Sequence, residues 1–293
     1  MNIGKRLTDK VAIVTGGASG IGAETVRAFA AHGATVVAAD VQTELGEQLV
    51  NEVNQAGGEA IYRNLDVTDE EAWKNLVDET VSTYEKLNIL GNIAGVSGRD
   101  PNMKIQPTVT PGPTIENTSP DVWNRIMDVN VKGVYLGTKM CIPAMRAAGG
   151  GSIINISTMS IKNNKPLFGA YAAAKSAMTS ITRTMAKEVG PDGIRVNAIC
   201  PGFIFGESVR WYLQSIAEKN GTSYQEEYDR IADEIALRFI PNSEQICGTV
   251  IFFASDLSIA CTGTSLDANG AVSYTHLRAH ETREDLGCRG LRE

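Results

Sequence analysis

Two residues near the middle of the chain, Tyr171 and Lys175, have the types and spacing for acid–base chemistry. They are four positions apart in a segment with helical periodicity, so their side chains are expected on one face of a helix. A free tyrosine has a pKa of about 10, and a nearby cation lowers that pKa by favouring the phenolate. We therefore predict that Tyr171 takes up a hydroxyl proton while hydride leaves the adjoining carbon for a cofactor. The alternative is a packing tyrosine, because Ala174, Met178 and Ile181 continue an apolar stripe.

A glycine-rich stretch early in the chain, TGGASGIG, has the composition of a phosphate-binding turn. Its Gly16, Gly20 and Gly22 lie between a β-branched run and an amphipathic segment. Glycines let such a turn tighten, and they let backbone N–H groups at the helix N-terminus approach a pyrophosphate. The spacing differs from the generic dinucleotide fingerprint, so a purely structural turn is the alternative.

Asp40 ends the second β-branched run, next to Val41. A carboxylate in that place accepts hydrogen bonds from the 2′-hydroxyl of an adenosine ribose and repels a 2′-phosphate. Neither Ser19 nor Val41 supplies a positive charge to hold that phosphate. The sequence therefore favours NAD over NADP. The alternative role of Asp40 is to cap the helix that follows.

The elements that must position these residues alternate regularly from Asp9 to about Asp267. Short, nearly continuous apolar strands between longer amphipathic segments indicate a parallel sheet covered by helices on both faces. We predict an α/β fold, with one doubly wound domain and a seven-stranded parallel sheet over residues 1–271. The strands are expected to begin near residues 11, 34, 60, 87, 151, 193 and 263, and the helices to span 21–32, 43–56, 69–85, 120–147, 170–189 and 243–255.

Two stretches interrupt this alternation and are expected to shape a substrate site. Residues 97–119 carry several prolines without periodicity, which predicts a long loop. Residues 203–240 are expected to form one or two polar helices. Both stretches follow the carboxyl end of a strand, where open α/β sheets bind ligands. Arg210, Trp211 and Tyr212 in the second stretch are expected to face either a substrate or solvent.

Three motifs occur in a fixed order: TGGASGIG, NIAG at 92–95 and YAAAK at 171–175. In this combination the chain resembles the short-chain dehydrogenase/reductase family over roughly residues 7–271. The resemblance implies a Rossmann fold, a nicotinamide dinucleotide, and oxidation of an alcohol or reduction of a ketone. It also implies a homotetramer.

The resemblance assigns roles to individual residues. Asn130, in MDVNVKG, matches the family's active-site asparagine, which would position a water that relays the proton outward. Lys175 would also hold the nicotinamide ribose. The threonine often found after the CPG motif is replaced here by Phe205 and Gly206, and the ending SLDANGA also departs from the family pattern. The expected cofactor-binding residues are Thr15, Gly16, Ser19, Gly20, Ile21, Gly22, Asp40, Asp66, Val67, Asn92, Ala94, Gly95, Tyr171, Lys175, Pro201, Gly202 and Ile204.

The catalytic hydroxyl of the family precedes the tyrosine by a spacing that falls here on Thr158. Threonine in place of the usual serine keeps the hydroxyl, but its methyl group and stiffer χ1 restrict where that hydroxyl can lie. Ser157 is expected to point to the other face of the strand. Ser160 is the second candidate if the loop bends. The predicted catalytic residues are Asn130, Thr158, Tyr171 and Lys175.

These assignments favour an NAD-dependent dehydrogenase for a small secondary alcohol, a polyol or a hydroxy acid. One alternative is an NADPH-dependent reductase of carrier-bound 3-oxoacyl groups, which Asp40 and the acidic composition disfavour. The other is a non-catalytic NAD-binding sensor, which only the replacement at Thr158 suggests.

Composition limits the other classes of partner. The chain has 293 residues, 43% hydrophobic and 21% charged, with a formal net charge of −7. An acidic balance gives no reason to expect binding to nucleic acid or to an anionic membrane. We find no signal peptide or apolar run long enough to span a membrane. The five cysteines form no close pair, which favours reduced thiols in the cytoplasm and predicts neither a disulfide framework nor a metal site.

Residues 272–293 differ in character from the rest of the chain. Positions 272–282, VSYTHLRAHET, resemble the translation of a sequencing-adapter sequence, so this segment is expected to be a non-native tail. A genuine polar tail is the alternative. We therefore assign no metal-binding role to His276, His280 or Cys288.

Overall fold

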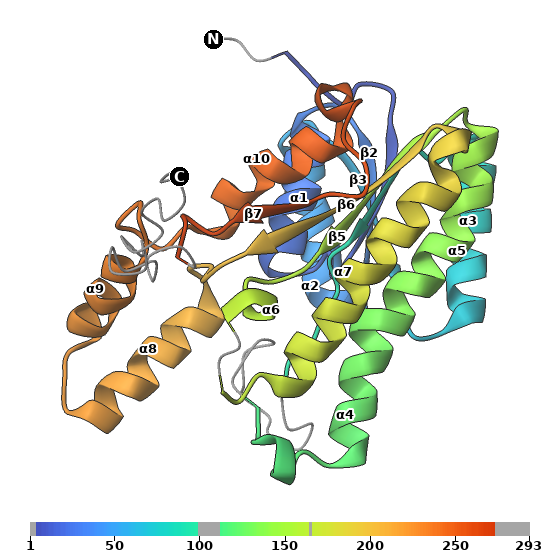
Figure 1. The fold of residues 1–293 in the computed structure, drawn as a ribbon. Coiled ribbons are helices and arrows are strands. Elements are labelled where there is room, and N and C mark those ends of the chain that lie inside the picture. The colour runs from blue at the N-terminus through green and yellow to red at the C-terminus, as the bar shows by residue number, and fades with distance from the viewer. Residues whose placement is uncertain (1–3, 99–111, 164–165, 273–293) are drawn as a thin grey trace, which may run out of the picture.

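Seven parallel strands form one sheet in the order β3-β2-β1-β4-β5-β6-β7, which confirms the predicted fold class (Figure 1). The computed structural model describes residues 4–98, 112–163 and 166–272. β1, β4 and most of β5 are buried, as expected for strands with helices on both faces. The strands are β1 (Val11–Thr15), β2 (Thr35–Asp40), β3 (Glu59–Asn64), β4 (Ile89–Asn92), β5 (Gly151–Ile156), β6 (Ile194–Pro201) and β7 (Ser265–Ala268).

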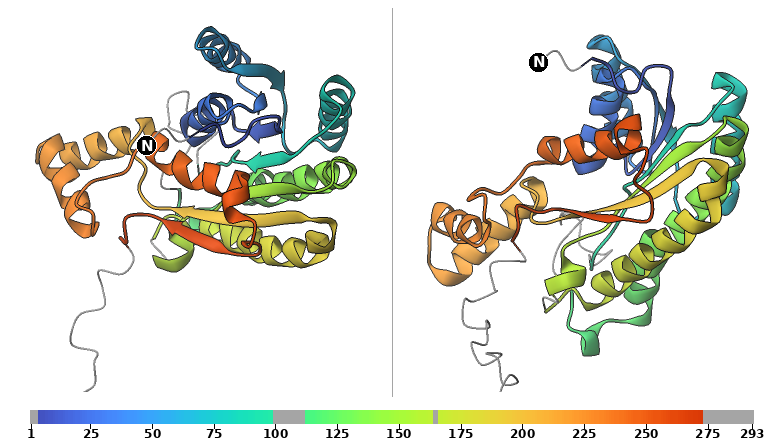
Figure 2. Two further views of the ribbon diagram at one scale, coloured as in Figure 1. Left: turned by 90° about the horizontal axis from the view of Figure 1, so that it is seen from above. Right: turned by 45° about the horizontal axis from the view of Figure 1, so that its top comes forward.

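Two layers of helices cover the sheet (Figure 2). One layer holds α1 (Gly20–Ala31), α2 (Thr43–Gln55) and α10 (Ser243–Ala254), and its core contains the fully buried Phe29. The other holds α3 (Glu70–Tyr84), α5 (Gly133–Ala147) and α7 (Gly169–Val189), with the fully buried Trp73. Burying a side chain of this kind contributes about 1.5–3 kcal/mol to stability. The bounds of α1, α2, α3, α7 and α10 lie within one residue of those expected, whereas the single helix expected over 120–147 is divided, and α5 begins only at Gly133.

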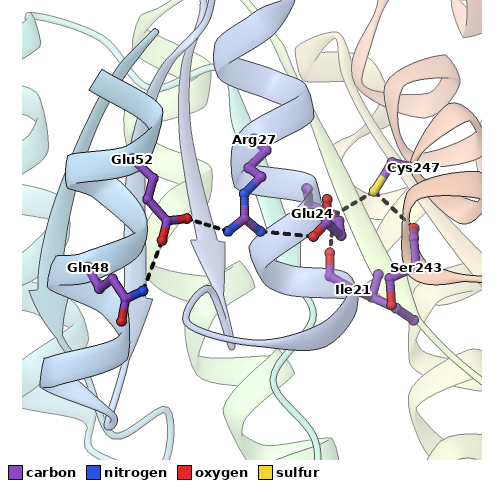
Figure 3. A network of polar contacts seen from close by, with 8 residues as sticks. Ile21, Glu24, Arg27, Gln48, Glu52, Ser243 and Cys247 are labelled. Atoms are coloured by element: carbon purple, nitrogen blue, oxygen red, sulfur yellow. Dashed lines mark hydrogen bonds and ion pairs between the residues drawn. The ribbon is translucent and has the colours of Figure 1, made fainter. Parts of the chain in front are cut away.

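The layer of α1, α2 and α10 is also joined by polar contacts (Figure 3). Arg27 on α1 forms ion pairs with Glu24 at 2.8 Å and with Glu52 on α2 at 2.7 Å. On the other side of α1, the Thr25 hydroxyl lies 3.8 Å from the Cys247 thiol of α10. These contacts link the helix that follows the glycine-rich turn to both of its neighbours.

The direction of the chain crossovers changes between β1 and β4, which are neighbours in the sheet. Thr15 at the end of β1 holds these two strands together, because its hydroxyl donates to the Gly91 carbonyl at 3.2 Å and accepts from the Ile93 N–H at 3.0 Å. Open α/β sheets bind ligands at this kind of switch point, outside the carboxyl ends of the strands.

The segment after β6 forms two helices, α8 (Glu207–Asn220) and α9 (Tyr224–Glu234), as expected for residues 203–240. They project beyond the body of the sheet (Figure 1). Their apolar sides form a separate cluster with Phe203, Phe205 and Met159, which fixes the pair to the carboxyl end of the sheet. Val272 packs into the same cluster, although it falls in the segment expected to be non-native. Residues 273–293, with His276, His280 and Cys288, lie outside the described residues.

The segment before α5 contains a short 3₁₀ helix, η1 (Ile115–Asn117), and then α4 (Pro120–Met127). The expected loop at 97–119 lies largely outside the described residues, which resume at Gly112. α4 continues into α5 through a π-helical turn, η2 (Asp128–Lys132). The short helix α6 (Ser160–Asn163) follows β5. Among the helices that the structure describes, none is long and apolar enough to cross a membrane.

Candidate active site

A cavity of about 1380 Å³ lies at the carboxyl ends of the strands. It brings most of the predicted site residues together, from Ser19 at one end to Tyr171 at the other. Three predicted residues are instead buried behind the wall: Thr15, Asn92 and Asn130. The predicted residues that line the cavity are Gly16, Ser19, Gly20, Ile21, Gly22, Asp40, Asp66, Val67, Ala94, Gly95, Thr158, Tyr171, Lys175, Pro201, Gly202 and Ile204.

The glycine-rich turn is packed so closely that a side chain at Gly16 or Gly22 would clash with neighbouring backbone atoms. Gly16 has φ +65°, and a Cβ on it would lie 2.9 Å from Ala94 Cα. A Cβ on Gly22 would lie 1.9 Å from the Gly16 carbonyl oxygen. Ser19 precedes α1 without capping it by its side chain. The N–H groups of the first turn of α1 are therefore available to an anionic group such as a pyrophosphate.

Asp40 fixes the loop on the other side of this turn. Its Oδ2 accepts from the Ala18 N–H at 3.0 Å, and its Oδ1 accepts from the Gln42 N–H at 3.0 Å. The carboxylate therefore holds the glycine-rich turn to the end of β2, and it also lines the cavity. Its neighbour Val41 is largely exposed at the same wall.

Tyr171 and Lys175 lie on the same face of α7, as their spacing predicted. The ammonium of Lys175 is 5.8 Å from the centroid of the Tyr171 ring, and it donates a hydrogen bond to the Ile156 carbonyl at 2.7 Å. Burial raises the pKa of Tyr171 to about 12, against a hydrogen bond with Thr158 that lowers it. Burial also lowers the pKa of Lys175 to about 8. In the structure, burial thus dominates over the lowering of the tyrosine pKa that the sequence analysis expected from the cation.

Of the three hydroxyls after β5, Ser157 has a partner of its own, whereas Thr158 and Ser160 contact each other. Ser157 pairs with Thr179 at 2.8 Å, so its hydroxyl points into the protein, as predicted. Thr158 pairs with the phenol of Tyr171. Its Oγ1 also lies 3.3 Å from Ser160 Oγ and accepts from the Ser160 N–H at 3.2 Å. Thr158 is therefore the hydroxyl at Tyr171, and Ser160 is in contact with Thr158.

Asn130 lies in the π-helical turn η2, a local irregularity that often occurs at functional sites. Its Nδ2 donates to the carbonyls of Val96 at 2.7 Å and Ile126 at 2.8 Å. Its Oδ1 is buried and has no hydrogen-bond partner among the residues that the structure describes. A Cβ built on Gly95 would lie 2.8 Å from that oxygen and 3.2 Å from Lys175 Nζ, so the two polar atoms approach the same point of the cavity wall.

Thr15 and Asn92, which the sequence analysis assigned to the cofactor, face the interior of the protein. The Thr15 hydroxyl is bonded to the backbone of β4. The Asn92 amide donates to Asn155 Oδ1 on β5 at 2.9 Å. Both side chains therefore hold the strand ends in register beneath the cavity.

The substrate side of the cavity contains residues that sequence reasoning did not identify. Trp211 and Tyr212 of α8 line it, as one of the two alternatives predicted, whereas Arg210 stacks on Phe205 with 5.1 Å between the guanidinium carbon and the ring centroid. Tyr212 itself stacks on Phe203 with 6.5 Å between ring centroids. The only sequence feature that indicated these substrate-side residues was that their segments follow the carboxyl ends of strands. Apolar lining residues that the sequence did not identify are Val96, Met159, Leu167, Phe168, Phe203 and Val209, and the cavity lining also includes the charged Asp121, Arg125, Asp128 and Glu207.

Comparison with known proteins agrees with this geometry. Residues 10–211 match the family described as short chain dehydrogenase. The chain belongs to the short-chain dehydrogenase family. It is 35% identical over 267 residues to a 3-alpha-(or 20-beta)-hydroxysteroid dehydrogenase of Mycobacterium bovis, covering 91% of this chain and 90% of that protein.

Two further relatives support the same conclusion. A cyclopentanol dehydrogenase of Comamonas sp. is 38% identical over 199 residues, which cover 68% of this chain and 74% of the relative. A solved short-chain dehydrogenase/reductase from Burkholderia xenovorans matches with a TM-score of 0.78 and 27% identity, covering 92% of this chain and 98% of that one. Membership of the short-chain dehydrogenase family makes the protein an oxidoreductase that uses a nicotinamide dinucleotide.

Proposed function

We propose that this short-chain dehydrogenase interconverts a secondary alcohol and its ketone with NAD, and that Tyr171 is the general acid and base. One observation carries the proposal: the phenol of Tyr171, paired with Thr158, lies in the same cavity as the open glycine-rich turn and Asp40. A sensor would need the dinucleotide site but would have no use for a half-buried tyrosine paired with a buried threonine beside a buried lysine.

The residues present fit a dinucleotide. The turn packs closely on its own backbone at Gly16 and Gly22, whereas a Cβ on Gly20 at the start of α1 would meet nothing within 4 Å. The N–H groups of the first turn of α1 favour an anion there. Asp40 would accept hydrogen bonds from the adenosine ribose and would repel a 2′-phosphate, which supports NAD. Asp66 and Val67 lie along the same wall, where the adenine would be held.

The acid–base chemistry follows from the residues around Tyr171. Bound oxidised NAD would supply the hydride acceptor, and its positive charge would favour the phenolate of Tyr171. Tyr171 takes the hydroxyl proton, and Thr158 donates a hydrogen bond to the reacting oxygen. Lys175 would hold the nicotinamide ribose. The unpartnered Oδ1 of Asn130 would hold a water that leads the proton away from Lys175.

The cavity wall supports a substrate with an apolar body. Phe168, Phe203, Trp211 and Tyr212 present aromatic surface, and Met159 and Val209 present aliphatic surface. Among the alcohol classes that the sequence analysis considered, a neutral secondary alcohol suits this wall better than a polyol or a hydroxy acid. The names of two relatives, which act on cyclopentanol and on hydroxysteroids, favour a ring-containing alcohol.

Steady-state kinetics with the full chain would test the proposal. Nicotinamide reduction is followed with NAD and with NADP across ring alcohols of increasing size, open-chain polyols and short hydroxy acids. We expect turnover that prefers NAD and ring alcohols, and a loss of at least about 1000-fold in Tyr171→Phe. Tight NAD binding without turnover on any compound would favour a sensor, and preference for NADPH with 3-oxoacyl thioesters would favour the reductase.

We also propose a homotetramer in the cytoplasm, following the family resemblance. Apolar side chains near the β7 edge support association, because Leu257, Ile259 and Leu266 are 55%, 72% and 41% exposed. Light scattering of the full chain, and of a chain ended at Val272, would measure the assembly. A monomer in both would contradict the tetramer.

A further inference from the structure

Ser160 contacts the hydroxyl of Thr158 through both of its own polar groups. The Ser160 N–H donates to Thr158 Oγ1 at 3.2 Å, and Thr158 Oγ1 donates to Ser160 Oγ at 3.3 Å. Both residues line the cavity. The Thr158 side chain also interacts with the phenol of Tyr171 and lowers its pKa, and both residues line the same cavity. The three hydroxyls of Tyr171, Thr158 and Ser160 therefore form one chain.

The hydrogen-bonding capacity of Thr158 gives this chain a direction. A threonine hydroxyl has one proton to donate and two lone pairs that accept. The Ser160 N–H occupies one lone pair. While Tyr171 is protonated, its O–H can occupy the other, and the Thr158 proton then points to Ser160 Oγ.

Loss of the Tyr171 proton reverses the chain. The phenolate accepts only, so the Thr158 proton must turn toward Tyr171 or toward the reacting oxygen beside it. When the Thr158 proton turns away from Ser160, a lone pair of Thr158 Oγ1 faces Ser160 in its place. The Ser160 O–H can then donate a hydrogen bond to Thr158 Oγ1. A hydroxyl that accepts two hydrogen bonds becomes a stronger donor, because bonds in a chain polarise one another.

The position of Ser160 is fixed from two sides. Lys162, two residues further in α6, forms hydrogen bonds to both carboxylate oxygens of Asp267 on β7, at 2.5 and 2.6 Å. Just before Ser160, the Met159 N–H donates to the Pro201 carbonyl at the end of β6 at 2.8 Å. α6 therefore holds Ser160 against Thr158 rather than leaving it on a free loop.

We propose that Ser160 is a positioning residue for the reaction, acting through Thr158: its N–H fixes the Thr158 oxygen, and its hydroxyl reverses direction as Tyr171 gains and loses its proton. This inference rests on the proposed dehydrogenase function. It also accounts for threonine in place of serine, since the stiff χ1 of Thr158 is matched by a fixed partner for its hydroxyl.

The test compares Ser160→Ala, Thr158→Val and the double variant with the wild type. Ser160→Ala keeps the N–H and removes only the hydroxyl. We expect kcat/KM for alcohol oxidation to fall about 3- to 10-fold, the loss expected for one neutral hydrogen bond, with the Kd for NAD unchanged. Ser160→Thr should restore activity. Ser82→Ala, an exposed hydroxyl on α3 remote from the cavity, is the matched control.

Two readouts separate positioning from a merely structural effect. Ser160→Ala should shift the acid limb of the kcat/KM profile to higher pH, because the phenolate loses support. It should have no further effect in the Thr158→Val background, because Ser160 acts through Thr158. The other titratable groups near Tyr171 are the same in every variant. They are Lys175, 5.8 Å from the Tyr171 ring on the same helix, and Cys200 on β6, which interacts with Lys175.

An optical titration makes the result independent of turnover. Ionisation of Tyr171 is measured by ultraviolet difference absorbance against Tyr171→Phe, in the free protein and in the NAD complex. A higher Tyr171 pKa in Ser160→Ala supports the proposal, even if the substrate class proves wrong. An unchanged pKa with kcat/KM within twofold of wild type would overturn it. A loss as large as that of Thr158→Val and additive with it would also overturn it, by making Ser160 a direct substrate contact.

Discussion

Gly95 lies so close to Asn130 that a Cβ on Gly95 would stand 2.8 Å from Asn130 Oδ1. The same Cβ would lie 3.2 Å from Lys175 Nζ. Real Cβ atoms essentially never approach another atom within 3.0 Å, so a side chain at position 95 must displace Asn130 Oδ1, and it would also crowd the Lys175 ammonium. The glycine after β4 thus keeps a place where the unpartnered carbonyl of Asn130 and the ammonium of Lys175 meet.

Gly95→Ala should therefore damage both activity and stability. We expect kcat/KM to fall about 10- to 100-fold, since a displacement of about 1 Å at catalytic groups has effects of that size. Stability should fall by about 1–3 kcal/mol from overpacking. Gly248→Ala on the exposed face of α10 is the control, because its Cβ meets nothing within 4 Å. That variant should gain up to about 1 kcal/mol with unchanged kinetics. Wild-type kcat/KM in Gly95→Ala would contradict the proposed roles of Asn130 and Lys175.

The double substitution Asp40→Ser and Val41→Arg should reverse the coenzyme preference. Serine keeps an acceptor near the Ala18 N–H, and arginine at the exposed position 41 offers a bidentate partner to a 2′-phosphate. We expect the ratio of kcat/KM for NAD to that for NADP to fall at least about 100-fold, measured with one alcohol. Val41→Arg alone should change the ratio much less, because Asp40 would pair with the new cation. An unchanged ratio in the double variant would show that Asp40 does not set the preference.

The fold was predictable because its signals are local. Buried parallel strands and amphipathic helices each leave a pattern within a dozen residues, so the expected elements match the observed ones closely. The spacing of Tyr171 and Lys175 is also a local signal, and it correctly predicted that the two side chains lie on the same face of α7. The α8–α9 pair was expected only as one or two helices, because its ends depend on a capping box at Ser223 and on packing against Phe205.

What the sequence could not supply is the direction of side chains at strand ends and the depth of burial. Thr15 and Asn92 sit in the right motifs, yet strand pairing turns both toward the interior. The pKa of Tyr171 depends on how much water α7 and the segment after β5 exclude, and the spacing of residues in the sequence does not indicate this. The apolar substrate wall is assembled from separate segments after β4, β5 and β6, so no single motif predicts it.

Gly206→Thr should strengthen cofactor binding. Gly206 is the N-cap of α8 with φ −167°, an extended conformation open to any residue. A Cβ there would meet only the Ile204 carbonyl oxygen, at 4.0 Å, so a threonine fits. It would cap α8 and place a hydroxyl at the cavity wall, where the family often has one. We expect the Kd for NAD, measured by calorimetry, to fall about 2- to 5-fold, with stability within about 0.5 kcal/mol of wild type. Weaker NAD binding would show that position 206 must stay open.

Two arginines should differ strongly in their contribution to stability. Arg195 on β6 is partly buried and donates to the Ser258 hydroxyl at 2.7 Å and to the carbonyls of Phe253 and Ser255 at 2.8 and 3.2 Å. Arg195→Met removes all three hydrogen bonds of this partly buried cation, although Ser152 and Ser258 still donate to the two carbonyls, and we expect a loss of about 2–4 kcal/mol. Arg27→Met removes only the exposed ion pairs and should lose less than about 1 kcal/mol. Urea unfolding at one protein concentration compares the two variants. Equal losses in the free energy of unfolding would show that the hydrogen bonds of Arg195 contribute no more than the exposed ion pairs of Arg27.

Lys175→Met should stabilise the protein while abolishing turnover. Burial lowers the folded-state pKa of Lys175 from 10.5 to about 8, so below pH 8 the native state holds a charge that burial disfavours. A one-unit pKa change corresponds to about 1.4 kcal/mol, and the Ile156 carbonyl left without its donor offsets part of the gain. We expect Lys175→Met to exceed the wild type by about 1–2 kcal/mol at pH 7.

The pH dependence gives this last prediction its sign. Between about pH 8 and 10.5 the unfolded chain keeps the Lys175 proton that the native protein has lost, so wild-type stability rises with pH relative to the variant. Tyr171 is present in both proteins, so the effect of its raised pKa largely cancels in the difference. Urea unfolding at pH 7, 8, 9 and 10 should show the advantage of Lys175→Met shrinking steadily above pH 8. A difference that stays constant across this range would mean that the ammonium of Lys175 is not destabilised by burial.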